Sequence, residues 1–62
     1  MPVPDILATI GVVRDDIERA QKTLRLALDA PDKEVSAVFH EKTRVALRAA
    51  IANAQAVLKV LE

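Results

Sequence analysis

His40 is the only imidazole in this 62-residue chain, and an imidazole is the side chain best suited to proton transfer near neutral pH. Ser36 lies four residues before it, so a helix would place the hydroxyl and the imidazole on one face. A hydrolase also needs an acid that orients the histidine, an oxyanion hole and a pocket, which a chain with one glycine does not readily build. We therefore expect no enzymatic activity, no catalytic residue and no small-molecule substrate, and we interpret His40 as a partly exposed side chain on a polar flank.

Acidic side chains cluster at Asp15, Asp16 and Glu18, where carboxylates could hold a divalent cation. Neighbouring residues of a helix point in different directions, so these three carboxylates would not converge on one ion. Arg14 and Arg19 lie beside them and indicate a solvated face with salt bridges. The chain also has no cysteine and no glycine-rich phosphate-binding loop. We expect neither a metal nor a cofactor.

Nine basic and nine acidic residues balance, without a run of like charges. This balance argues against a general polyanion binder, whose affinity would depend on excess Lys and Arg. Arg14, Arg48 and Lys59 interrupt the apolar segments, so no window reaches the roughly 18 apolar residues of a membrane span. The apolar N-terminus lacks the basic region of a signal peptide. We expect a cytoplasmic protein without a membrane partner.

Two helices joined by one turn must position these residues. Pro31 lacks the amide that a continuing helix needs, and it disfavours helical backbone at Ala30. Asp32 can cap the helix that follows, although Ser36 is a second possible start. These signals predict an all-α fold, an antiparallel hairpin of two helices. The predicted elements of the single domain, residues 1–62, are a helix at about 4–29, a turn at about 30–32 and a helix at about 32–61.

Apolar residues of both helices recur at alternating intervals of three and four, the spacing of a coiled-coil seam. The second helix has two such seams, which border an apolar arc of roughly 240° centred near Phe39, Ala50 and Val57. One neighbouring helix cannot cover so wide an arc, so we expect the first helix to cover one seam and another chain to cover the other. The first-helix seam is Val3, Ile6, Ile10, Val13, Ile17, Ala20, Leu24 and Ala27. The second-helix seams are Leu47, Ile51, Ala54, Leu58 and Leu61, and Val35, Phe39, Lys42, Ala46, Ala49, Asn53, Ala56 and Val60.

Oligomerisation is the remaining way to stabilise so short a chain, because it has no cysteine for disulfides and one histidine for a structural metal. We predict a homodimeric four-helix bundle. A higher oligomer, a hetero-oligomer and the relative direction of the two hairpins stay open. Asn53 either selects the register of this interface or borders solvent at the edge of the arc. The predicted interface residues are Ile6, Ile10, Val13, Ala46, Ala49, Ile51, Asn53, Ala54, Ala56, Val57, Leu58, Val60 and Leu61.

The layout resembles the Rop family of RNA-binding four-helix bundles in length, in the single proline-bearing turn and in the sequence Leu28-Asp29-Ala30 before it. The RNA-contacting face of that family has no residue-by-residue match on the first helix, so the resemblance concerns architecture. Our first hypothesis is a non-enzymatic homodimeric regulator or adaptor that binds another protein through exposed apolar helix surface. The alternative is a small nucleic-acid-binding regulator with Rop-like architecture. It would use a basic flank of the second helix: Lys33, His40, Arg44, Arg48 and Lys59.

Overall fold

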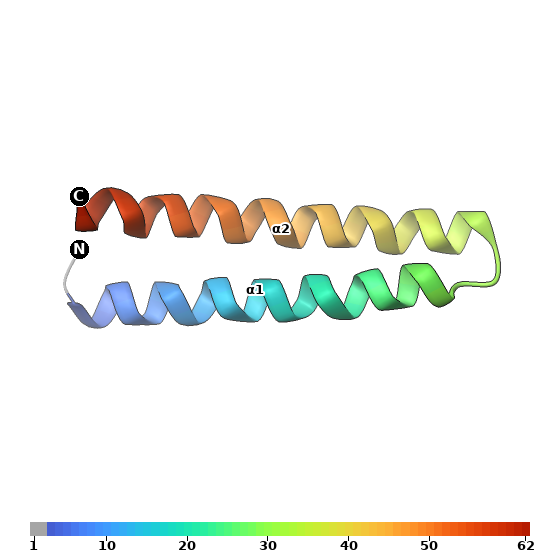
Figure 1. Cartoon of the computed structure of the whole chain (residues 1–62), viewed down its shortest axis with the longest axis horizontal. Coiled ribbons are helices and arrows are strands. Elements are labelled where there is room, and N and C mark those ends of the chain that lie inside the picture. Colours follow the sequence, from blue (N-terminus) through green and yellow to red (C-terminus); the bar gives the residue numbers. More distant parts are fainter. Residues whose placement is uncertain (1–2) are drawn as a thin grey trace.

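The protein is a helical hairpin, seen in a computed structural model that describes residues 3–62 and their side chains from residue 5 onward. Helix α1 spans Val3–Asp29 and helix α2 spans Lys33–Leu61. The two helices lie antiparallel along their whole length, with the first turn of α1 beside the last turn of α2 (Figure 1). The Cα atoms extend over 46 × 14 × 11 Å. The all-α, two-helix hairpin is therefore confirmed.

The turn between the helices is fixed by local hydrogen bonds. Asp32 has extended backbone (φ −128°, ψ 160°), and its Oδ1 accepts a hydrogen bond of 2.9 Å from the Val35 amide. This arrangement is an N-cap, which satisfies an amide that has no partner within the helix. Ser36, the alternative start, lies inside α2 and donates its hydroxyl to the Ala27 carbonyl at 2.9 Å. Its role is to join the start of α2 to the end of α1.

The surface where the helices meet, the hairpin seam, contains the residues least exposed to solvent. Its members recur at intervals of three and four on both helices, so each helix presents one continuous face to the other. The seam residues are Ile6, Thr9, Val13, Asp16, Ala20, Thr23 and Ala27 on α1, and Ser36, Phe39, Thr43, Ala46, Ala50, Asn53 and Val57 on α2.

The core of this seam is made of small side chains. Among the residues whose side chains the structure describes, five apolar ones are buried, and all but Val57 are alanines: Ala20, Ala27, Ala46 and Ala50. Alanine lets helix axes approach closely, but it removes little apolar surface from water. No large side chain among the described residues is fully buried. The hairpin therefore holds a thin core.

Polar groups fix the register of the two helices. The Oγ1 atoms of Thr23 and Thr43 lie 2.7 Å apart, and Thr43 Oγ1 lies 2.9 Å from the Phe39 carbonyl oxygen. Each threonine has one hydroxyl proton, so one of the two donates across the seam and the other donates to the backbone of its own helix. Thr23 therefore lies level with Thr43. Asp16 is 5% exposed in the same seam and accepts a hydrogen bond from Arg19 of its own helix.

The predicted seam of the first helix is wrong as a description of its contact with the second. Its members alternate between two sides of α1, because only every second one faces α2. The packed members are Ile6, Val13, Ala20 and Ala27. The exposed members are Ile10, Ile17 and Leu24, at 49%, 48% and 39%. The side chain of Val3 lies outside the described residues.

The second helix also meets its neighbour differently from the prediction. Helix α1 packs on the centre of the apolar arc, at Phe39, Ala50 and Val57, together with part of one border. The border formed by Leu47, Ile51, Ala54, Leu58 and Leu61 is exposed throughout. The other border is divided: Phe39, Ala46 and Asn53 face α1, Ala49 is half-buried, and Val35, Lys42, Ala56 and Val60 are exposed.

Candidate interaction surfaces

One side of the hairpin carries the large aliphatic side chains that the seam does not bury. All of these residues except Leu61 directly follow a seam position, which rotates the side chain by about 100° away from the opposite helix, and Leu61 follows Val60, which continues the seam spacing. In an antiparallel pair the residues rotated in this sense lie on the same side of both helices. We call this surface the aliphatic face. It comprises Leu7, Ile10, Ile17, Leu24 and Leu28 of α1 and Leu47, Ile51, Leu58 and Leu61 of α2, all between 39% and 72% exposed.

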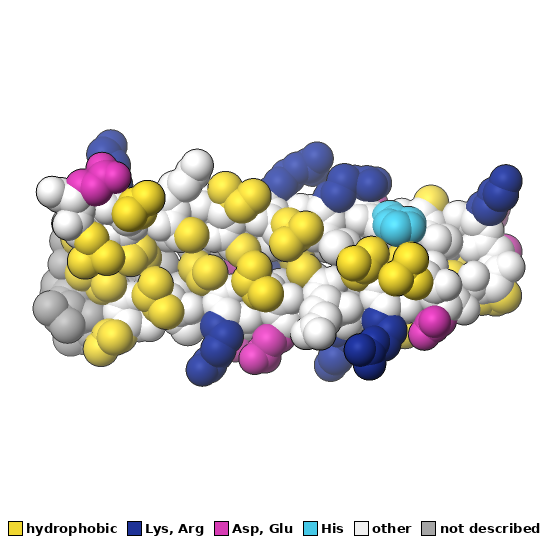
Figure 2. Space-filling model, in the orientation of Figure 1, with side chains coloured by type: hydrophobic (Ala, Val, Ile, Leu, Met, Phe, Trp, Pro, Cys, Tyr) yellow, Lys and Arg dark blue, Asp and Glu magenta, His cyan; other side chains and the backbone are white. Residues whose placement is uncertain are grey.

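The aliphatic face is one strip along the hairpin. Figure 2 shows apolar side chains over both helices in the half of the molecule where the termini lie, continuing along the middle toward the turn, with charged side chains along both long edges. An apolar centre with a charged rim is the usual composition of a protein–protein interface. Large exposed apolar patches on protein surfaces mark interaction sites.

The opposite side of the hairpin carries a second apolar surface with smaller side chains, which we call the valine face. Its residues directly precede seam positions, so they are rotated in the other sense. Lys42 lies beside this surface, with its Nζ 5.6 Å from the centre of the Phe39 ring. A shallow hollow of about 260 Å³ at this side is lined by Arg19, Thr23, Glu41, Lys42 and Val45. The exposed members of the valine face are Val12, Leu26, Val35, Val38 and Val45.

The predicted interface residues are distributed over three surfaces of the hairpin. Their role in an oligomer stays a prediction. On the aliphatic side are Ile10, Ile51, Ala54, Leu58 and Leu61. In the hairpin seam are Ile6, Val13, Ala46, Asn53 and Val57, of which Ala46 and Val57 are buried by α1. Ala49 and Ala56 precede seam positions on the valine side, and Val60 continues the seam spacing beyond Val57.

Sequence reasoning missed several residues of the two faces as interface candidates. The predicted seams contain Ile17, Leu24 and Leu47 but the predicted interface does not, and the seam spacing does not predict the valine face. The sequence does carry a signal for both surfaces: a large apolar residue directly after or directly before a small or polar seam residue. Leu47 after Ala46 is one example, and Val45 before Ala46 is another.

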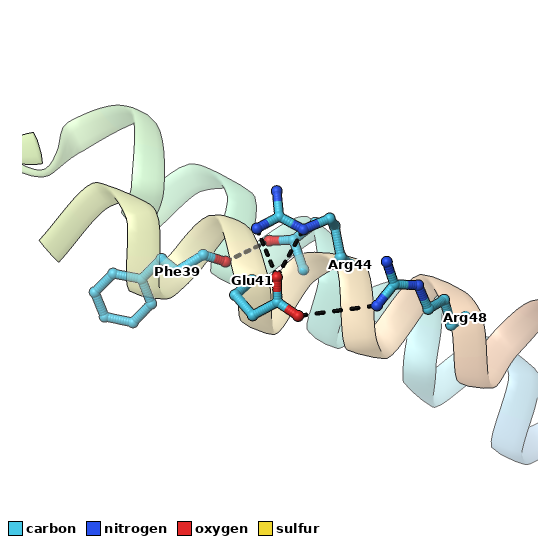
Figure 3. Close-up of polar contacts among 5 residues, drawn as sticks. Phe39, Glu41, Arg44 and Arg48 are labelled. Carbon is cyan, nitrogen blue, oxygen red and sulfur yellow. Dashed lines mark hydrogen bonds and ion pairs between the residues drawn. The ribbon is translucent and has the colours of Figure 1, made fainter. Parts of the chain in front are cut away.

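The predicted basic flank is divided in the structure. Arg44 donates to Glu41 Oε2 from Nε at 2.8 Å, and a terminal nitrogen of its guanidinium lies 2.6 Å from the same oxygen. Arg48 approaches Glu41 Oε1 at 3.8 Å, so the two arginines share one carboxylate (Figure 3). His40 is half-buried and directly follows the seam residue Phe39, which places it on the aliphatic side. Lys33 begins α2 and Lys59 lies near its end, so these cations do not form one site with the arginines.

The acidic cluster also separates. Asp16 is buried in the seam and pairs with Arg19, whereas Asp15 is exposed and lies 3.8 Å from Arg14. Among residues 3–62 no group of three or more His, Cys, Asp or Glu side chains could hold a metal ion. Neither α1 nor α2, as far as each is described, has the length and apolar character needed to cross a membrane.

A comparison with protein-family models, with curated proteins and with solved structures finds no match to this chain. The surfaces themselves must therefore carry any functional argument.

Proposed function

We propose that this chain is a non-enzymatic cytoplasmic interaction protein, a homodimeric regulator or adaptor that binds another protein through exposed apolar helix surface. The observation that carries the proposal is the presence of two apolar faces on opposite sides of a hairpin with a thin core. One face serves self-association, and the other stays available to a partner.

The thin core supports self-association. A domain of this size gains little stability from its own core, and the buried apolar residues here are four alanines and one valine. Covering the aliphatic face would remove leucine and isoleucine side chains from water, each contributing roughly 1.5–3 kcal/mol when fully buried. The Cα atoms of the hairpin extend over 46 Å by 14 Å, a projected area of about 640 Å². Side chains extend beyond the Cα atoms and add to this area, which approaches the roughly 800 Å² per partner of a stable interface.

The valine face supports binding to a different protein. A second copy on the aliphatic face leaves Val12, Val38 and Val45 exposed on the outside of the bundle, at 47%, 54% and 55%. Lys42 adds a positive charge beside these side chains. We therefore expect the partner to present a short apolar segment, such as one face of an amphipathic helix.

Nucleic-acid binding by the basic flank is the alternative function. Arg44 and Arg48 lie side by side on α2, but Glu41 neutralises part of their charge and the net charge of the chain is zero. Counterion release on phosphate binding requires excess positive charge, so these cations supply a weak driving force.

We expect no tight binding of labelled RNA or DNA in titrations at low and moderate salt. Salt-sensitive binding of RNA or DNA that Arg44→Gln/Arg48→Gln abolishes would instead establish the alternative function.

In a pull-down from the native host, the wild type should retain a protein that the Val38→Asp/Val45→Asp variant loses, because two carboxylates would replace the apolar centre of the valine face. The variant should keep the wild-type oligomeric mass, which serves as its folding control.

A further inference from the structure

We infer that the second copy covers the aliphatic face with its turn at the same end of the bundle, so that α1 of each copy packs on α2 of the other. This inference rests on the proposed homodimer and specifies its arrangement. It depends on four exposed charged side chains at the rims of the aliphatic face: Glu18, Arg25, Glu41 and Arg48.

Two symmetric arrangements place aliphatic face against aliphatic face. A twofold axis along the hairpin keeps both turns at one end and places α1 opposite α2 of the partner subunit. A twofold axis across the hairpin places the turns at opposite ends, with α1 against α1 and α2 against α2. Neighbouring helices are antiparallel in both cases, so helix direction does not distinguish them.

The charged rim residues occupy the positions that flank such a contact. Each lies two residues after a seam position, a rotation of about 200°, so its side chain projects from the outer edge of the hairpin, where the aliphatic face ends. In packed helical pairs, charges at flanking positions determine the partner and its orientation. Among the described residues Glu18 and Arg25 have no ion-pair partner within the hairpin, whereas Glu41 and Arg48 lie 3.8 Å apart and would exchange this contact for contacts across the interface.

The register of the hairpin places opposite charges at the same level. Positions are counted along each helix from the contact of Thr23 with Thr43. Glu18 and Arg48 each lie five residues from it toward the open end of the hairpin, where the first turn of α1 lies beside the last turn of α2. By the same measure Arg25 and Glu41 each lie two residues toward the turn. A twofold axis along the hairpin preserves these levels. Glu18 then faces Arg48 of the partner subunit, and Arg25 faces Glu41 of the partner subunit, at each of the two contacts between copies.

The other arrangement brings like charges together. Glu18 lies two residues from the middle of α1, and Arg48 lies one residue from the middle of α2. A twofold axis across the hairpin exchanges the two halves of each helix, so both residues would lie close to their own copies. Like charges at adjacent positions destabilise a contact between helices. The rim charges therefore favour turns at the same end.

A spin label at a single cysteine measures the arrangement directly, because the chain has no cysteine of its own. Lys33→Cys places a label at the exposed start of α2. The dimer should give a label-to-label distance clearly shorter than the 46 Å length of the hairpin. A distance comparable to that length would overturn the arrangement while leaving the homodimer intact. A mass of one chain would instead overturn the homodimer on which the inference rests.

Charge reversal provides a second, independent test. Glu18→Arg and Arg48→Glu should each raise the dimer dissociation constant by roughly 2- to 20-fold, since every dimer loses two exposed ion pairs. The double variant should recover an affinity close to that of the wild type, because the reversed charges attract again. Single variants with unchanged affinity, or a double variant as weak as the sum of the single ones, would contradict the pairing.

Discussion

Replacing Ile17 by aspartate is expected to abolish self-association. Ile17 is 48% exposed in the hairpin and lies next to the middle residue of α1, in the centre of the aliphatic face. In the proposed dimer this substitution would bury an unpaired carboxylate in each copy, at a cost of about 3–5 kcal/mol per charge. At 1.4 kcal/mol per tenfold, two such charges should raise the dissociation constant by roughly 10,000-fold or more. Sedimentation equilibrium at micromolar concentration would measure the loss.

The matched control for this variant is Val45→Asp. Val45 is 55% exposed on the valine face, so the control introduces the same charge at a similar exposure on the opposite side of the hairpin. It should leave the oligomeric mass unchanged. If Ile17→Asp kept the wild-type mass as well, the aliphatic face would not be the interface between copies.

The second large effect is expected from Ala46→Leu, which tests the hairpin seam. Ala46 is 0% exposed, so a larger side chain has no space unless the helices move apart. Overpacking of this kind costs about 1–3 kcal/mol. The free energy of unfolding should fall by this amount in denaturant titrations followed by circular dichroism, performed at one fixed protein concentration because association also contributes to stability.

Ala52→Leu is the control for overpacking. Ala52 lies on the same helix and is exposed, so the leucine projects into solvent and should change the free energy of unfolding by less than about 0.5 kcal/mol. Equal stability of Ala46→Leu and Ala52→Leu would show that α1 does not pack on α2 at this position.

The helices and the turn could be predicted because their signals are local. Pro31 interrupts the helical sequence, and Asp32 offers a cap for the helix that follows it. The structure begins α2 at Lys33, one residue after the predicted start, with Asp32 as the capping residue. Such signals act within a few residues, so they need no knowledge of the tertiary contacts.

The rotation of the helices about their axes could not be predicted from apolar spacing alone. An arc of roughly 240° contains more apolar surface than one neighbour covers, so hydrophobicity does not determine which part meets α1. In the structure, alanines and threonines lie in the contact between the two helices, and leucines and isoleucines are exposed on the surface of the hairpin. Asp16, Thr23 and Thr43 are polar and therefore did not resemble core positions, although hydrogen bonds satisfy them in the seam.

Part of the aliphatic face could be predicted from the sequence. The sequence seam of α1 contains Ile10, Ile17 and Leu24, and these lie on the aliphatic face, whereas its other described members face α2. Such a seam fits a helix of a four-helix bundle, where the side chains that face the bundle core contact one helix of the same chain and one helix of another chain. Asn53 is half-buried in the hairpin seam, where it faces α1. Its expected role in selecting register between copies stays a prediction.

The mass of the wild-type protein in solution shows directly whether the hairpin self-associates. Sedimentation equilibrium at micromolar concentration should give at least two chains of 6.7 kDa, with circular dichroism of the same sample showing high helix content. The thin alanine core predicts that folding and association occur together. A mass of 6.7 kDa for a sample that is fully helical and unfolds cooperatively would show that the hairpin is stable alone and does not self-associate.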